Sequence, residues 1–344
     1  MKQIFSFATA LLIVATSNAQ VNNEAISATL QNGETSSIYY GTDALKTALS
    51  NAEDGSIITL SSGSFSVPSN IEKSVKIYGA GFEDDTLTGI PRTFLNGDII
   101  MKGVDGVHVD NFYIEGVYIN GSIIINKAEN DSLIQGTKIV KCRMTGVLLN
   151  ENSNQTIIRQ CRIEGSIEGR TLAINLMVQN CLFSHIMYFD TQSTIIVDHC
   201  ITSNYYWQYY GPYVYKNSII IGNNSSAIQS GATLINCLGN EGGFNSTNIR
   251  VNCYYSFNWK TLFADGQNNL NYYLTDTQIP RTWQLSEPET FKGDDDTPVG
   301  VTGGDFPWEK IPSTPRIVRS QIDSKTVNGK LHINIKAEAR PVTE

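Results

Sequence analysis

The sequence predicts an all-β protein, folded as a parallel β-helix. Two observations predict this fold. Cysteines recur with a period of ~19 residues, and short β-branched runs alternate with Asn, Gly and Ser between them. Such a period is too short for a propeller blade of ~40 residues, but it suits one coil made of three short strands.

Six cysteines mark the repeat, at Cys142, Cys161, Cys181, Cys200, Cys237 and Cys253. Their spacings are 19, 20, 19, 37 and 16, and Ser218 divides the longest one into 18 and 19. Successive coils stack at the inter-strand spacing of ~4.8 Å, so one residue type at a fixed place in the coil forms a column. We expect this column to point inward, where a small apolar side chain packs well.

Disulfides are the alternative for these cysteines, because exported proteins meet oxidising conditions. Stacked side chains hold their Cβ atoms ~4.8 Å apart, whereas a disulfide needs ~3.8 Å. Ser218 in the same slot also favours free thiols that are kept for their shape. No CxxC or HxxxH spacing occurs, so we predict no metal site and no cofactor.

The residue before each member of the cysteine column is expected to form a tight bend. These residues are Lys141, Gln160, Asn180, His199, Asn217, Asn236 and Asn252. Asn tolerates the left-handed conformation and bonds to nearby backbone groups, which suits such a bend. We interpret His199 as one of these turn residues, and His185 as a residue of another turn.

The N-terminus reads as a secretory signal peptide over residues 1–19. Lys2 precedes a mostly apolar run, and Ser17-Asn18-Ala19 forms a small-residue cleavage site. The run is shorter than the ~20 apolar residues that span a bilayer. An uncleaved anchor is the alternative. We therefore expect an exported protein (periplasmic, cell-surface or extracellular) with no transmembrane segment after cleavage.

Four further regions follow the signal peptide. Residues 20–56 form an arm and a capping helix, whose apolar face is Ala44, Leu45, Ala48, Leu49 and Ala52. Residues 57–275 form the coils, and the prolines of residues 276–315 indicate an extended connector. Residues 316–344 hold two strand-like runs joined near Asn328-Gly329, a hairpin signal. Within the connector, "GDDDTP" could bind calcium, but it lacks the ligand pattern of a known calcium loop, and we interpret it as a solvated turn.

A family resemblance strengthens the fold prediction. The stretch "ALKTALSNAEDGSIITLSSGSF", then "IYGAG" and coils containing Asn-Cys, resembles the pectin-lyase-like superfamily over roughly residues 40–275. The C-terminal part resembles the end of uncharacterised secreted β-helix proteins of Bacteroidetes. The resemblance implies a right-handed parallel β-helix, with an N-terminal capping helix and a C-terminal tail like a β-hairpin. Enzymes of this superfamily mostly degrade acidic polysaccharides.

The catalytic motifs that this resemblance would require are absent as sets. Neither an acidic calcium cluster with downstream arginines nor the NTD, DD, GHG and RIK set is present, and GxSxG does not occur. Arg143 and Arg162, each one residue after a cysteine, should be neighbours on the outer face and could bind a carboxylate. The same column continues with apolar residues, which favours a covered face over an open groove.

The coil "NYYWQYYGPYVYKN" (residues 204–217) holds seven aromatic residues without exceeding the normal coil length. Counting six residues from each cysteine places Leu148, Ile167, Met187 and Tyr206 in one column, which we expect to face inward. The flanking columns, Val147, Ser166, Ile186 and Tyr205 on one side and Leu149, Glu168, Tyr188 and Trp207 on the other, should then face outward.

Tyr188, Tyr205 and Trp207, with Tyr209 nearby and Glu168 at the edge, thus form a predicted ligand-binding face, because exposed aromatic rings stack on sugars. The alternative is that the C-terminal tail covers these rings.

The formal net charge of −8 and the lack of a basic cluster argue against nucleic acid as a partner. We expect a non-catalytic protein that binds a polysaccharide or cell-surface glycan. The alternative is a polysaccharide lyase or glycoside hydrolase acting on polymers that contain uronates.

Overall fold

The computed structural model describes residues 26–86, 88–104, 106–126, 132–169, 175–202, 213–221, 231–239, 244, 246–255, 261–265, 282–322, 325–326 and 328–339. The predicted signal peptide, and Tyr205, Tyr206, Trp207 and Tyr209 of the aromatic coil, lie outside these residues. The described chain is all-β apart from one helix, α2 (Ala44–Asn51).

The helix α2 covers the N-terminal end of the core. Asp43 occupies its N-cap position, and Ala44, Leu45, Ala48, Leu49 and Ala52 are all buried, as their helical spacing predicts. Two strands that were not predicted from the sequence precede the helix: β1 (Ser27–Asn32) and β2 (Thr35–Tyr40). They pair antiparallel with each other, and β1 also pairs antiparallel with β3 (Ile57–Leu60).

The larger part of the chain forms two long sheets, each with twelve described strands. Sheet A continues from β2, β1 and β3 through β5 (Lys76–Tyr78), β9 (Tyr113–Glu115), β13 (Lys138–Val140), β17 (Thr156–Arg159), β19 (Asn175–Gln179), β21 (Thr194–Asp198), β23 (Tyr213–Lys216), β25 (Thr233–Ile235) and β27 (Ile249–Val251). Every neighbouring pair from β3 onward is parallel.

Sheet B is parallel throughout its pairs. It contains β4 (Gly63–Ser66), β6 (Thr93–Asn96), β7 (Ile99–Ile100), β10 (Tyr118–Ile119), β11 (Ser122–Ile125), β14 (Arg143–Met144), β15 (Gly146–Leu149), β18 (Arg162–Gly169), β20 (Leu182–Met187), β22 (Ile201–Thr202), β24 (Ile219–Ile220) and β26 (Leu238–Gly239). A short sheet C holds β8 (Val109–Asp110), β12 (Ile134–Gln135) and β16 (Ser153–Asn154).

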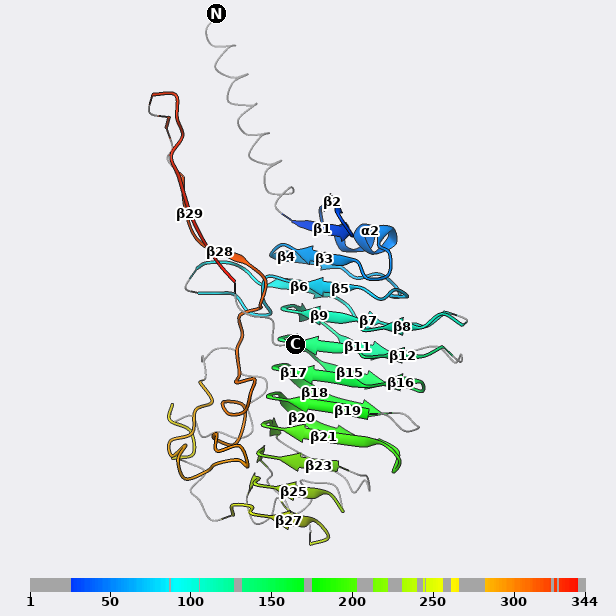
Figure 1. The fold of residues 1–344 in the computed structure, drawn as a ribbon, viewed down its shortest axis with the longest axis vertical. Helices are drawn as coiled ribbons and strands as arrows, with labels where there is room; N and C mark the ends of the chain where they lie inside the picture. The colour runs from blue at the N-terminus through cyan, green and yellow to red at the C-terminus, as the bar shows by residue number, and fades with distance from the viewer. Residues whose placement is uncertain are drawn as a thin grey trace, which may run out of the picture.

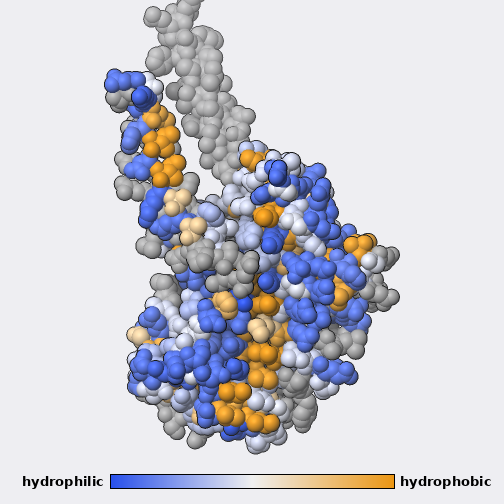
Figure 2. All heavy atoms as spheres, in the orientation of Figure 1, coloured by the Kyte–Doolittle hydropathy of each residue, from blue (hydrophilic) through white to orange (hydrophobic). Residues whose placement is uncertain are grey.

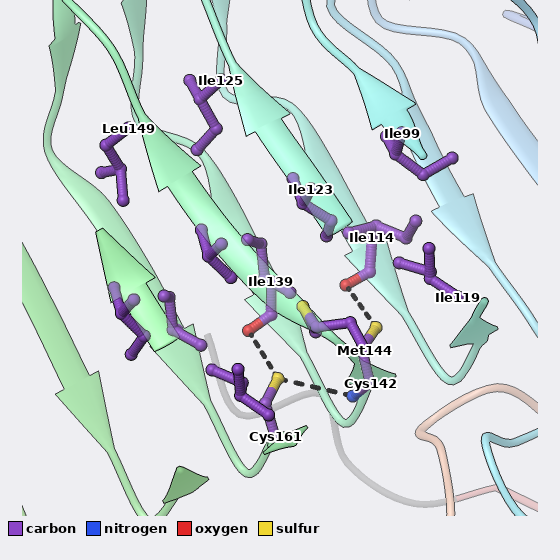
Figure 3. Packing of buried hydrophobic residues seen from close by; sticks show 14 of the residues in the cluster. Ile99, Ile114, Ile119, Ile123, Ile125, Ile139, Cys142, Met144, Leu149 and Cys161 are labelled. Atoms are coloured by element: carbon purple, nitrogen blue, oxygen red, sulfur yellow. Dashed lines mark hydrogen bonds between the residues drawn. The ribbon is translucent and has the colours of Figure 1, made fainter. Parts of the chain in front are cut away.

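The chain visits the sheets in turn, and each pass adds one layer to the stack (Figure 1). Inward side chains therefore form columns through the layers: Ile158, Val178 and Val197 are in register on sheet A and fully buried. Figure 3 shows how such residues from several strands meet in one continuous core. These long parallel sheets are compatible with the predicted β-helix.

Five cysteines of the column are buried, Cys253 at its end is half-buried, and all six thiols are free. Each thiol also forms hydrogen bonds: Cys161 Sγ donates to the Arg159 carbonyl at 3.2 Å and accepts the Cys142 N–H at 3.4 Å. Figure 3 shows this contact between successive layers. Ser218 reproduces the pattern, since its Oγ accepts the Cys200 N–H at 3.1 Å and donates to the Lys216 carbonyl at 2.6 Å. This position therefore requires a small side chain that can both donate and accept a hydrogen bond. The prediction that the cysteines are kept for their shape alone was incomplete.

The column of turn residues adopts the predicted left-handed backbone. All seven members have φ between 47° and 52°: Lys141, Gln160, Asn180, His199, Asn217, Asn236 and Asn252. The bend turns the chain from sheet A to sheet B one residue before the inward cysteine slot. His199 thus belongs to a turn as predicted, whereas His185 lies inside strand β20 and not in a turn.

The prediction that Leu148, Ile167 and Met187 form one inward column is wrong for two of these three residues. Ile167 is buried as expected, but its partners in register are Val147 and Ile186, which are also buried. Leu148 and Met187 are instead half-buried.

A local irregularity explains the error. Strand β18 carries one extra residue between Ile163 and Ser166 relative to β20, so counting from the cysteine slips by one in the neighbouring layers. Consequently Val147, Ile186 and Leu149, which were expected to face outward, belong to the core.

The C-terminal part of the chain runs back along the stack. We call residues 282–315 the strap; Figure 1 shows it beside the sheets, leading from the end near β27 to the end near β5. Gly300 of the strap (φ 84°) lets the strap backbone lie close to sheet B, because a Cβ at this position would lie 2.6 Å from Ile219 Cδ1. After the strap, β28 (Arg316–Ile322) and β29 (Ile333–Glu338) pair antiparallel across the two runs expected to be strands.

Candidate functional site

One outward column of sheet B carries the predicted arginine pair. We call it the sheet B column; its members are in register from layer to layer and comprise Phe94, Tyr118, Arg143, Arg162, Leu182, Ile201, Ile219 and Leu238. Arg143 and Arg162 are Cα partners on β14 and β18, so the expected neighbourhood is present.

Both arginines already hold a carboxylate of the chain. Arg143 Nε donates to Glu164 Oε1 at 2.8 Å, and its Nη2 contacts the same oxygen. Arg162 Nη1 lies 3.7 Å from Glu83 Oε1. Each arginine is only 6% exposed. An external carboxylate would have to displace Glu164 or Glu83 to bind there.

The upper end of the sheet B column joins aromatic rings to guanidinium groups. Two guanidinium groups lie near the Tyr118 ring: Arg92 Cζ is 5.1 Å from the ring centroid and Arg143 Cζ is 4.6 Å from it. Phe94 meets Tyr118 edge to face, with centroids 5.1 Å apart. Phe94 and Tyr118 remain half-buried and so reach the solvent.

The lower end of the sheet B column is a second hydrophobic core. Leu182, Ile201, Ile219 and Leu238 are at most 1% exposed and cluster with Leu262, Phe263, Trp283, Leu285, Val299 and Val301. The strap and the segment before it therefore cover this part, as the apolar residues of the column predict. The alternative that the C-terminal tail covers Tyr205 and Trp207 concerns residues outside the described ones.

A second outward column borders the upper part of sheet B. Its members are half-buried and in register: Ile100, Ile124, Leu148, Glu168 and Met187. Glu168 accepts a hydrogen bond from Ser166 Oγ at 2.5 Å. Tyr188, directly after Met187, is 47% exposed and left-handed (φ 65°), so its ring is accessible as expected.

His185, which the sequence placed in a turn, also lies on this face. It lies opposite Ser166 on the neighbouring strand. Burial lowers the pKa of His185, while the Glu168 carboxylate opposes part of that shift. Its Nδ1 is buried and has no hydrogen-bond partner within the described residues. Because β18 and β20 are irregular here, periodicity alone could not have placed it.

The turn column fastens the strap to the stack. Asn180 Nδ2 donates to the carbonyls of Val301 (3.1 Å) and Gly303 (2.8 Å). Gln160 Nε2 donates to the Pro307 carbonyl at 2.6 Å, and the Arg159 guanidinium lies 3.5 Å from the centroid of the Phe306 ring. Asn was predicted for its backbone conformation, but its side chain also binds the strap.

The "GDDDTP" turn takes part in the same contact, which corrects its interpretation as a merely solvated turn. Asp294 pairs with Lys216 (3.0 Å) and accepts from Asn217 Nδ2 (2.7 Å), and these contacts hold the pKa of Asp294 below its usual value, with the Asn217 hydrogen bond as the largest cause. His199 contacts Asp198, Asp295 and Thr297 through its two ring nitrogens, at 3.0, 3.4 and 3.1 Å respectively.

The upper end of the strap is anchored on a buried carboxylate. Glu115 is 1% exposed and accepts hydrogen bonds of 2.7 Å from Tyr113 Oη, Ser313 N and Ser313 Oγ. Lys141 Nζ lies 4.0 Å from Glu115 Oε1. Burial, followed by the Glu115 charge, raises the pKa of Tyr113, which therefore stays a hydrogen-bond donor.

The described residues contain no cluster of three or more His, Cys, Asp or Glu side chains that could hold a metal ion. Within the same residues, no helix has the length and apolar character needed to cross a membrane. Comparison with known proteins gave no match to a family model, to a curated protein or to a solved structure.

Proposed function

We propose that this chain is an exported right-handed parallel β-helix that binds a glycan without catalysis, on the part of sheet B that the strap leaves open. We call this surface the open face; it comprises Phe94, Tyr118, Leu148, Glu168, Met187 and Tyr188. The observation that carries the proposal is the change in the sheet B column, from aromatic and charged residues above to aliphatic, strap-covered residues below.

The composition of the open face suits a sugar chain. Aromatic and apolar side chains offer flat surfaces to the C–H faces of sugar rings. Glu168, and His185 beside the open face, offer polar atoms for hydroxyl groups. Five layers from β6 to β20 span roughly 20 Å at the inter-strand spacing, which is long enough for a short oligosaccharide. Exposed Tyr188 stands at one end.

The test is a glycan array with the full chain, followed by calorimetric titration of any glycan that binds. Tyr188→Ala and Tyr118→Ala should each weaken binding at least about tenfold, as expected for an aromatic residue that dominates a contact. Tyr40→Ala is the matched control, because Tyr40 is 60% exposed on the distant strand β2. Equal binding by all three variants, with unchanged circular dichroism, would remove the open face as the binding surface.

A polysaccharide lyase or glycoside hydrolase acting on uronate polymers is the second candidate, and His185 favours it. A neutral imidazole can accept a proton, and burial favours that neutral form here. An ultraviolet assay for unsaturated lyase products, and a reducing-end assay for hydrolysis, distinguish the two candidates. Product formation that His185→Gln abolishes would replace the binding proposal with the enzymatic one.

A further inference from the structure

In the hairpin formed by β28 and β29, all the side chains that the structure describes, at residues 325–326 and 328–339, are exposed. Every residue of β29 is exposed, and Leu331, Ile333 and Ile335 alternate along the chain with exposed fractions of 46%, 51% and 52%. Side chains two residues apart lie on the same face of a strand, so Ile333 and Ile335 form an apolar strip, and Leu331 precedes it by two residues. Figure 1 shows the hairpin extending away from the stacked sheets. An isolated two-stranded hairpin is marginally stable in water, which indicates that another surface supports it.

The outer face of sheet A carries a matching apolar surface. Figure 2 shows an orange stripe along the lower layers of the stack. The strands of sheet A carry apolar residues at outward positions. Ile157, Met177, Ile196 and Val214 lie in one column, which continues through Thr233 to Ile249, and Ile235 and Val251 lie beside it. Ile249 and Val251 are 60% and 44% exposed. Apolar residues that gather in this way commonly mark an interaction surface.

A second molecule can pack on the outer face of sheet A, whereas the edge strand of the sheet opposes pairing with another strand. On β27, the last strand of sheet A among the described residues, Arg250 is the partner of buried Leu234 and so stands at an inward position. Its guanidinium lies 5.7 Å from the Phe244 ring centroid and 5.6 Å from that of Tyr255. An inward charge on the last strand opposes the addition of another strand at that edge.

Charge also makes the two surfaces complementary. Residues 316–344, which contain the hairpin, have six Lys and Arg against three Asp and Glu, whereas the whole chain has 25 against 33. Residues 287–296 have five acidic residues and one lysine. The Asp294–Lys216 pair holds this acidic loop beside sheet A, next to Ile235, which is the partner of Lys216.

We propose that the hairpin of one chain docks on the lower outer face of sheet A in a second copy. The apolar strip of β29 packs on Ile249, Val251 and their neighbours, while the basic hairpin faces the acidic loop. Within one chain the hairpin lies at the opposite end of the stack from this surface (Figure 1). The contact is therefore head to tail, and repeated contacts produce a row of molecules or a closed ring.

The experiment measures the molar mass of the full chain by light scattering over a range of concentrations, at low and high salt. The mass should rise with concentration, and salt should oppose the rise because it screens the charge attraction. Ile335→Lys on the hairpin and Ile249→Lys on sheet A should each weaken self-association at least about tenfold. Val107→Lys is the matched control, since Val107 is 49% exposed in a separate loop and should leave association unchanged.

Mixing the two variants gives the decisive result. Each retains the surface that the other has lost, so an equimolar mixture should form a two-chain complex that does not grow further. This outcome also proves that both variants are folded. A wild-type chain that is monomeric at all concentrations would overturn the proposal, as would a mixture that stays monomeric. If the chain is monomeric and the Ile335 side chain is nevertheless shielded from solvent, the proposal is also overturned, because the hairpin then folds back on its own chain.

Discussion

The two halves of the sheet B column share one geometry and differ in everything that contacts them. Phe94, Tyr118, Arg143 and Arg162 occupy the same outward register as Leu182, Ile201, Ile219 and Leu238. The upper residues pair with nearby aromatic rings and carboxylates, whereas the lower ones are sealed by the strap and the segment before it. The coil decides where a side chain points, and the covering segment decides which residue type is stable there.

The largest effect is expected at the upper anchor of the strap. Glu115→Ala should lower the free energy of unfolding by about 3–5 kcal/mol, because Lys141 and Ser313 lose their buried partner. Urea denaturation measures this change, and limited proteolysis should show earlier cleavage in residues 310–315. Glu115→Gln keeps the shape and part of the hydrogen bonding, so it should cost less. Equal losses for both variants would contradict a role for the charge.

The lower half should be the next most sensitive. Ile219→Ala removes a fully buried side chain from the second core and should cost about 2–4 kcal/mol. Phe94→Ala, at the same position of an upper layer, should cost only about 1–2 kcal/mol, since Phe94 is half-buried. The difference between the two variants measures what the strap contributes, and it would vanish if the strap did not cover Ile219.

The turn column offers a finer comparison. Asn180→Ala loses two hydrogen bonds to the strap and strains a left-handed backbone, for a cost of about 2–3 kcal/mol. Asn252→Ala is the control, because exposed Asn252 has the same backbone (φ 51°) and lies outside the strap contact. It should cost about 1–2 kcal/mol from the backbone alone. Equal losses at both sites would exclude a role of the Asn180 side chain in holding the strap.

The cysteine column should tolerate its own substitute. Cys161→Ser should change the free energy of unfolding by less than about 1 kcal/mol, because Ser218 already makes the same donor and acceptor contacts. Cys161→Ala should cost more, since it leaves the Cys142 N–H without the sulfur. Thermal denaturation of the two variants decides whether hydrogen bonding or size controls this slot.

The smallest effect concerns thiol reactivity. Cys253 is half-buried at the end of the column, and its pKa is lowered to about 7, chiefly by hydrogen bonding with Cys237. Burial raises the pKa of Cys142, Cys161, Cys181 and Cys237. Alkylation of the folded protein above pH 7 should therefore modify Cys253 first, because the thiolate reacts. Mass spectrometry of unreduced, unfolded protein should then count six modified cysteines, and any missing pair would reveal a disulfide.

Sequence reasoning succeeded where a pattern is local or repeats in every layer. The cysteine period, the left-handed turn column and the apolar face of α2 depend only on local geometry, and the structure has all three. It failed where one layer departs from the rest. The extra residue in β18 displaced the columns by one and hid Val147 and Ile186 in the core, because a one-residue slip reverses the side that each residue faces.

By itself, the sequence determined the all-β stack of parallel strands and the inward place of the cysteines, since both follow from a short repeat and the alternation of strands. Only the tertiary structure showed that Asn180, Asn217 and Glu115 bind the strap. It alone showed which internal carboxylates occupy the two arginines: Glu164 pairs with Arg143, and Glu83 lies near Arg162. These contacts join residues far apart in the chain, up to 198 positions for Glu115 and Ser313. No local pattern encodes which distant segment will cover a given face.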